Sequence, residues 1–194
     1  FSVRVTDAKG QTATRSLSLT TNRTNSNISF VTSTLPNGVV GKAFGTCSCG
    51  ADCPTGFTNA IQATGGNGTY DWSISSNSLP AGLSLSNTSS VSTTNITGSP
   101  TTTGATTFTV RASSNGNSAS KVFTVSVNNA IIHKFTPTSG GQGLKTQLIG
   151  EGFDAAFANN TVEFGTAGAL ATGTALTSAG GCDTLTVNVP AANS

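Results

Sequence analysis

The sequence predicts an all-β protein made of antiparallel sandwiches, and three features of the chain lead to this prediction. Short runs of apolar residues alternate with Ser, Thr or Asn. A period of two over about four to eight residues is typical of a strand with one buried face. Breaks rich in Gly, Pro, Asn and Ser separate the runs at roughly 8–12 residues, which is the spacing of sandwich strands. No stretch of the sequence carries a convincing helical period.

The alternating runs occur throughout the chain. They are Phe1–Val5, Tyr70–Ile74, Phe108–Val110, Phe123–Val127 and Leu185–Val189. In the second run we expect Tyr70 and Trp72 to face the core and Asp71 to face solvent, because successive side chains of a strand point to opposite faces. Trp72 is therefore interpreted as a core anchor and not as a platform for stacking sugars.

The composition argues against several classes of function. The length of 194 residues suits one large or two small domains, and we expect two. Charged residues make up 8% of the chain, against about 25% in ordinary soluble domains, which indicates a neutral surface rich in hydroxyl groups. The nine Lys and Arg residues are scattered singly, so we expect no nucleic-acid partner. We also expect no membrane span in this sequence, because no apolar run approaches roughly 20 residues.

Residues 1–20 and 108–126 contain the same pattern. Phe1, Val3 and Arg4 align with Phe108, Val110 and Arg111, and the series continues with Gly10 and Gly116, Leu17 and Phe123, and Leu19 and Val125. Because repetition of a unit is the mark of a tandem array, residues 1–22 are interpreted as the last hairpin of an earlier copy of the unit that contains residues 108–126.

Two sources could complete that hairpin, which by itself would be marginally stable in water. The sequence contains no Met, so we expect it to be part of a longer chain whose preceding residues supply the rest of the sandwich. The alternative is a neighbouring chain that accepts the hairpin by strand addition. In that case the donated apolar face consists of Phe1, Val3, Val5, Leu17 and Leu19.

Residues 28–128 carry an ordered series of motifs. The series is Leu-Pro-x-Gly at 35–38, Ala-x-Gly-Gly at 63–66, Tyr-x-Trp-x-Ile at 70–74, Leu-Pro-x-Gly-Leu at 79–83 and Gly-x-Pro at 98–100. It resembles the He_PIG-type immunoglobulin-like repeats of bacterial surface proteins. The resemblance implies an immunoglobulin-like sandwich over residues 28–128, in which the Cys-rich residues 45–56 look like an insertion.

Residues 129–191 carry a second series. It consists of Pro-x-Ser-Gly at 137–140, Gly-x-Gly-Phe at 150–153, Val-x-Phe-Gly at 162–165 and Val-x-Val-Pro at 187–190. This series is similar to the IPT/TIG family of immunoglobulin-like domains. Some members of that family bind DNA, but the basic loops which that role needs are missing here, so the resemblance implies only the fold. The predicted fold class is thus a tandem of immunoglobulin-like β-sandwiches, preceded by the terminal hairpin of an earlier repeat.

The four cysteines, Cys47, Cys49, Cys53 and Cys182, are interpreted as disulfide partners. An even number in a composition typical of secreted proteins favours disulfides, and four cysteines allow three pairings. We expect Cys47 and Cys49 on one face of a strand, where a direct bond between them is strained, whereas Gly50 lets the chain turn so that Cys53 returns to either. We therefore favour one local bond and one that reaches Cys182, within one chain or between neighbours.

A zinc site is the competing interpretation of the cysteines. Its ligands would be Cys47, Cys49, Cys53 and either Cys182 or His133, since zinc takes four N or S ligands in a closed structural site. The spacing C-x-C-x3-C lacks the paired C-x2-C knuckles that are typical of such sites. No metal ligand and no cofactor is assigned.

The sequence offers little for catalysis. Its single histidine, His133, begins an alternating strand and is interpreted as a surface imidazole. Glu151 and Asp154 are the only acids that are near neighbours, and they lie in a turn segment where we expect both to be solvated. We therefore predict that the chain is not an enzyme and has no catalytic residue.

The favoured function is structural and lies outside the cell. Tandem sandwiches, a neutral surface and disulfide staples fit a stalk, an adhesin shaft or a filament subunit of a bacterial cell surface. Its partners would be other copies, neighbouring domains of the same array, or a ligand on a host or environmental surface. The alternative is a carbohydrate- or ligand-binding accessory module of a larger secreted protein or enzyme, which would need an exposed aromatic platform or a calcium site.

Overall fold

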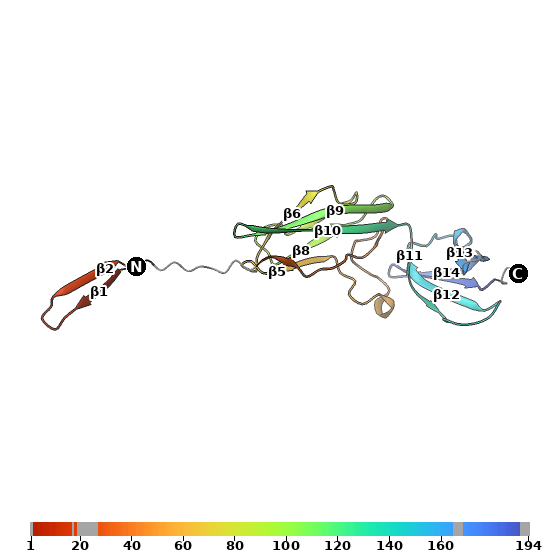
Figure 1. The fold of residues 1–194 in the computed structure, drawn as a ribbon. Coiled ribbons are helices and arrows are strands. Elements are labelled where there is room, and N and C mark those ends of the chain that lie inside the picture. The colour runs from red at the N-terminus through yellow and green to blue at the C-terminus, as the bar shows by residue number, and fades with distance from the viewer. Residues whose placement is uncertain (1, 17, 19–26, 165–168, 191–194) are drawn as a thin grey trace.

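The structure is a computed structural model, and it describes residues 2–16, 18, 27–164 and 169–190. Strands form nearly all of its regular structure (Figure 1). The only helical segments in the described residues are two 3-10 turns, η1 (Gly50–Asp52) and η2 (Phe157–Asn159). The prediction of an all-β protein is confirmed. Within the described part of the chain, no helix has the length and apolar character needed to cross a membrane.

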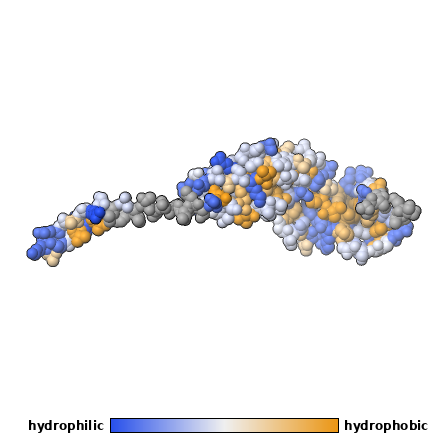
Figure 2. All heavy atoms as spheres, in the orientation of Figure 1, coloured by the Kyte–Doolittle hydropathy of each residue, from blue (hydrophilic) through white to orange (hydrophobic). Residues whose placement is uncertain are grey.

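The first element is a hairpin of β1 (Ser2–Thr6) and β2 (Thr12–Ser16). The two strands form a sheet of their own, and Figure 1 shows it apart from the sheets that follow. Both strands are exposed along their whole length, and Figure 2 shows apolar residues on the surface of the hairpin. The side of this hairpin that carries Val3 and Val5 is thus free of packing partners among the described residues.

The first complete module consists of two sheets of four strands, with the orders β4-β10-β9-β6 and β3-β5-β8-β7. The strands of this module are β3 (Ser29–Phe30), β4 (Gly38–Val39), β5 (Ala60–Thr64), β6 (Asp71–Ser76), β7 (Leu83–Ser86), β8 (Thr93–Gly98), β9 (Gly104–Ser114) and β10 (Asn117–Asn128). One pairing within the first sheet is parallel, that of the short β4 with the end of β10.

The core of this module lies between its two sheets. It contains Trp72 from β6, Phe108 and Val110 from β9, Phe123 and Val125 from β10, and Ile61 and Ile96 from the opposite sheet. The rings of Tyr70 and Trp72 meet edge to face with centroids 5.4 Å apart, and both side chains are buried while Asp71 is exposed. The expected alternation over Tyr70–Ile74 is confirmed, and Trp72 is a core residue.

The hairpin β1–β2 and the hairpin β9–β10 have the same strand register. Val3 pairs with Arg15 as Val110 pairs with Lys121, and Val5 pairs with Ala13 as Ala112 pairs with Ala119. Both turns place a glycine, Gly10 or Gly116, at a positive φ of 80° and 82°, where residues with a side chain are disfavoured. The repeat seen in the sequence is therefore also a repeat of structure.

The second module is a set of five strands in the order β11-β12-β15-β14-β13. Its strands are β11 (Ile131–Thr136), β12 (Lys145–Glu151), β13 (Thr161–Phe164), β14 (Ala169–Ala179) and β15 (Cys182–Asn188). The first part of β14 pairs with β13 and the second part pairs with β15, with an irregularity between Gly173 and Ala175. This change of partner lets β13 fold over the core.

That second core is smaller than the first. Leu148, Leu185 and Val187 are buried, and Phe153, Val162 and Phe164 pack against them. Gly173 lies where β14 changes its pairing from β13 to β15. The side chain of Leu185 packs closely against Gly173, because a Cβ on Gly173 would lie 2.7 Å from Leu185 Cδ1. A small core supplies little hydrophobic stabilisation, which makes covalent support from the first module more important.

Candidate functional site

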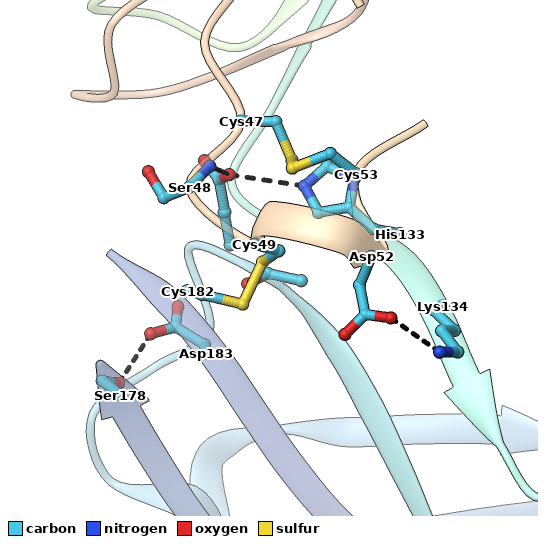
Figure 3. The surroundings of a disulfide bond; sticks show 12 residues. Cys47, Ser48, Cys49, Asp52, Cys53, His133, Lys134, Ser178, Cys182 and Asp183 are labelled. Atoms are coloured by element: carbon cyan, nitrogen blue, oxygen red, sulfur yellow. Dashed lines mark hydrogen bonds and ion pairs between the residues drawn. A yellow bond between two sulfur atoms is a disulfide. The ribbon is translucent and has the colours of Figure 1, made fainter. Parts of the chain in front are cut away.

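The sequence-predicted cysteines meet at the junction between the two modules. The Cys-rich loop is part of the first module and lies against β11, β12 and the start of β15 (Figure 3). Its two ends are close together, because a Cβ on Gly45, which has φ +73°, would collide with Asn59. A loop whose two ends lie close together can leave the sandwich and return without disturbing the strands of the sandwich.

All four cysteines are in disulfides. Cys47 is bonded to Cys53 with a Cα–Cα distance of 5.9 Å, and Cys49 is bonded to Cys182 with a Cα–Cα distance of 4.9 Å. The first bond closes the loop on itself, and the second joins the loop to the first residue of β15. Cys47 and Cys49 do not lie on a strand as expected, because the segment is a loop that leads into η1.

The two bonds differ greatly in their expected effect on stability. By the loop-entropy relation, a loop of about seven residues contributes about 2.4 kcal/mol to the free energy of unfolding. The Cys49–Cys182 bond spans a sequence separation of 133 residues, and a loop of that size contributes about 5 kcal/mol. The long bond is thus the principal covalent constraint, and it fixes one module against the other.

A buried pair of ionisable side chains lies beside the disulfides. His133 on β11 and Glu151 at the end of β12 have side-chain exposures of 1% and 5%, and Nε2 of His133 lies 3.4 Å from Oε1 of Glu151. The same carboxylate oxygen accepts a hydrogen bond of 2.7 Å from the backbone N–H of Ser48 in the loop. Glu151 therefore binds the first module to the second.

The expectations for these two residues were wrong. His133 is not a surface imidazole, because the Cys-rich loop covers β11 and the ring of Phe57 meets the His133 ring edge to face at 6.1 Å. Glu151 is not a solvated loop acid, because it ends a strand that faces the same loop. Asp154 is exposed as expected and accepts a hydrogen bond from the backbone N–H of Ala156.

Further contacts tighten the junction. Lys134 Nζ lies 2.6 Å from Oδ1 of Asp52 in η1. The turn after β12 is held by Asp183, whose carboxylate accepts hydrogen bonds from the N–H groups of Gly152 and Phe153 and from the Ser178 hydroxyl. Neither acid was singled out in the sequence, because most of their partners lie 30 or more residues away, and only Ser178 is near in sequence.

The disulfides, hydrogen bonds and ion pairs of the junction form a clamp, that is, a set of bonds that holds the two modules together. Cys49 Sγ lies 3.4 Å from the carbonyl oxygen of Gly150, but a disulfide sulfur has no proton to donate, so this is only a packing contact. His133 has a carboxylate partner, yet its ring is enclosed by both modules, and no described hydroxyl or thiol nucleophile is bonded to it. A nucleophile beside a base is what acyl transfer requires.

The remaining predicted residues lie far from the junction. Val3 and Val5 are 42% and 64% exposed on the hairpin, whereas their counterparts in β9, Val110 and Ala112, are fully buried. Phe1, Leu17 and Leu19 lie outside the described residues.

Two packed sheets with the long β9–β10 hairpin define the first module as an immunoglobulin-like β-sandwich. Residues 50–128 match the sequence model of a family described as "Putative Ig domain". The resemblance noted in the sequence is confirmed over that range, and so is the fold class of tandem immunoglobulin-like sandwiches. Curated protein sequences give no match to the chain.

Three solved structures show a distant likeness to the chain. An endo-fucoidan hydrolase of glycoside hydrolase family 107 is 15% identical with a TM-score of 0.37, and the match covers 98% of this chain and 29% of the hydrolase. A chimeric titin Z1Z2 is 13% identical with a TM-score of 0.37, over 84% of this chain and 82% of that one. The titin domains Z1Z2 in complex with telethonin are 12% identical with a TM-score of 0.33, over the same shares. The chain therefore spans less than a third of the hydrolase.

Proposed function

We propose that this chain is a non-catalytic structural protein of the cell exterior, a stalk, an adhesin shaft or a filament subunit. The observation that carries the proposal is the Cys49–Cys182 disulfide, which joins the Cys-rich loop of the first module to β15 of the second. A covalent bond across the junction transmits force between modules and keeps their relative orientation. Neither property is required of domains that only need to be tethered by a linker.

The redox chemistry of the bonds supports the extracellular part of the proposal. Disulfides persist in oxidising surroundings and are rare in the cytosol of mesophiles. The charged content of 8% also leaves few Lys and Arg side chains for proteases to recognise. Both features suit a protein exposed on a bacterial surface.

The repeated hairpin supports a tandem array. Val3 and Val5 are exposed in β1, whereas Val110 and Ala112 occupy the same register in β9 and are fully buried. In this proposal residues 1–22 belong to a preceding immunoglobulin-like unit, residues 28–128 form the next, and residues 129–191 form an IPT/TIG-like unit. The preceding unit is completed by further sequence or by a neighbouring chain, so other copies are the expected partners.

Small-angle X-ray scattering tests the structural role of the clamp. The oxidised chain is compared with the double variant Cys49→Ser/Cys182→Ser, and the variant Cys47→Ser/Cys53→Ser serves as the control that loses only the local bond. We expect the first variant to scatter as two modules with variable orientation, and the control to scatter like the oxidised chain. Identical profiles for all three proteins would show that the long bond does not hold the modules in place.

Labelling of intact cells tests the location. Cells that express the full-length protein are treated with a membrane-impermeant amine-reactive label, with a cytosolic protein as the control. We expect label on this protein and none on the control, and immunogold images that show the copies joined end to end. Protection of the protein from the label until the cells are lysed would reject the proposal.

A hollow on the second module favours a second candidate function, that of a ligand-binding accessory module. The hollow has a volume of about 670 Å³ and is lined by polar side chains that include Gln147, Thr174, Thr186 and Asn188. Trp72 and Tyr70 cannot supply a stacking platform, because both are buried. Glycan-array binding that disappears in Gln147→Ala/Asn188→Ala, with folding unchanged, would favour this function over the structural one.

A further inference from the structure

Four side chains that can bind metal ions meet at the junction. They are Cys47 and Cys49 from the loop, His133 from β11 and Glu151 from β12, and their ligand atoms all lie within 4.8 Å of one another. Figure 3 shows the His133 ring beside the Cys47–Cys53 disulfide and close to Cys49. The disulfide partners of these two residues, Cys53 and Cys182, do not belong to this cluster of four.

A second observation concerns His133, one of these four residues. Nδ1 of His133 is buried and has no hydrogen-bond partner, the only such side-chain atom among the described residues. A buried polar atom without a partner costs about 1–3 kcal/mol, so an atom that binds it would stabilise the junction. His133 and Glu151 also line a cavity of about 10 Å³, roughly the space that one water-sized sphere occupies.

The set of ligands is that of a zinc-type site. Zinc is held by thiolate, imidazole and carboxylate groups in a tetrahedron, with Zn–S of about 2.3 Å and Zn–N of about 2.0 Å. Such a tetrahedron has ligand atoms roughly 3.3–3.8 Å apart, so separations of up to 4.8 Å need to shorten by about 1 Å. A loop that is no longer restrained by disulfides can make such a change.

In the oxidised protein both sulfurs are bonded to other sulfurs and are poor ligands, because the thiolate is the form that binds metals. We propose that the reduced protein binds one divalent cation of the zinc class through Cys47, Cys49, His133 and Glu151. The junction is then held by a metal ion when the cysteines are reduced and by disulfides when they are oxidised. This inference does not depend on the role as a stalk.

A phosphine can reduce both disulfides to thiols in a balanced reaction. Each disulfide takes two electrons from one phosphine, and one water supplies the two protons of the thiols and the oxygen of the phosphine oxide. Metal binding then displaces the thiol protons of Cys47 and Cys49 into solvent, as deprotonation of the ligands requires. Cys53 and Cys182 remain as thiols.

A matched pair of double variants tests which sulfurs bind. Cys53→Ser/Cys182→Ser keeps the two proposed ligands, and Cys47→Ser/Cys49→Ser keeps the same number of thiols at the other positions. Both are reduced with phosphine, freed of the reductant without oxygen, and titrated with Co²⁺. We expect the first variant to bind one Co²⁺ with the thiolate charge-transfer and tetrahedral d–d absorption bands, which Zn²⁺ then abolishes, and the second variant to show no such bands.

Single substitutions test the other two ligands. In the reduced chain with all four cysteines, His133→Phe and Glu151→Gln should each weaken Co²⁺ binding by about 100-fold. Loss of a residue that only supports a metal ligand costs about 10–100-fold, and loss of a ligand itself should cost at least as much. The control is Asp52→Asn, which removes a nearby carboxylate that is outside the cluster and should leave the affinity within about threefold of wild type. Unchanged affinity in both ligand variants would overturn the proposal.

A second measurement remains decisive if a variant does not fold, as judged from the fluorescence of Trp72 and from circular dichroism. The reduced wild-type chain is alkylated with and without Zn²⁺, and the modified cysteines are mapped by mass spectrometry. Slower alkylation of Cys47 and Cys49 alone in the presence of Zn²⁺ supports the site. Equal protection of all four cysteines, or of none, rejects it.

Discussion

Reduction of the Cys49–Cys182 bond should lengthen the part of the chain that a stretching force can extract. The bond holds two Cα atoms 4.9 Å apart although 133 residues separate them in the sequence. An extended chain spans at most about 3.3–3.6 Å per residue, so the residues between the two cysteines give about 450 Å of additional length. Most of the first core lies within this closed segment, whereas Leu185 and Val187 of the second core lie after Cys182 and outside it.

Single-molecule force spectroscopy measures this length. The chain is held by handles at its two ends and stretched in the oxidised state, then again after treatment with phosphine. In the oxidised state the force bypasses the closed segment through the sulfur–sulfur bond, so only residues before Cys49 and after Cys182, most of β15 among them, can be extended, and the closed segment releases no length. After reduction, both modules should unfold and release the additional length.

The control for this experiment is the variant Cys47→Ser/Cys53→Ser. The bond that this variant lacks spans a separation of six residues, which corresponds to about 20 Å of extended chain. The extension of the oxidised variant should therefore differ little from that of the oxidised wild type. If reduction of the wild-type chain adds only about 20 Å of length, the long bond is refuted. Loss of the long bond should also lower the free energy of unfolding by about 5 kcal/mol.

The remaining predictions concern stability, measured as the free energy of unfolding in guanidinium chloride. Trp72→Ala should destabilise the first module by about 3–5 kcal/mol, because it removes a buried aromatic side chain from the core; a loss below about 1 kcal/mol would place Trp72 outside the core. Asp183→Ala should destabilise the second module by about 2–4 kcal/mol, since it leaves two N–H donors in the turn after β12 and the Ser178 hydroxyl on β14 without an acceptor; Asp183→Asn, which keeps an acceptor, should cost less. Gly98→Ala should cost about 1–3 kcal/mol, because φ is +110° and a Cβ would collide with the backbone of Gly82, and a neutral effect would contradict that geometry. Lys134→Ala should cost only about 0–1 kcal/mol despite the short distance to Asp52, because the Lys134 side chain is 53% exposed.

The alternation of apolar and polar residues predicted the strands well because burial on one face of a strand is a local pattern. Tyr70, Asp71 and Trp72 show this directly, since the two aromatic residues are buried and the acid between them is exposed. The repeated hairpin could be found for the same reason, and its register is preserved in the structure. The position of the Cys-rich loop could not be predicted from the sequence, because the loop packs on a surface of the second module.

His133 illustrates the limit most clearly. Within its own strand it lies between the exposed Ile132 and Lys134, so alternation places it on the other face of β11, but the local sequence does not show that another module covers that face. The enclosure comes from Phe57 and the Cys-rich loop, which belong to the other module. Glu151 is hidden in the same way, and its hydrogen bond reaches Ser48 across 103 residues of sequence.

The all-β class, the two sandwich modules with the copied hairpin, and the presence of sulfurs able to form cross-links could all be predicted from the sequence, because each follows from residue type and spacing along the chain. Which surfaces meet, and therefore which acid is buried, which imidazole is enclosed and which cysteine bonds to β15, became clear from the folded molecule alone. The Lys134–Asp52 and Cys49–Cys182 contacts join segments 82 and 133 residues apart in the sequence, and distances of that kind are fixed only when both modules have folded and docked.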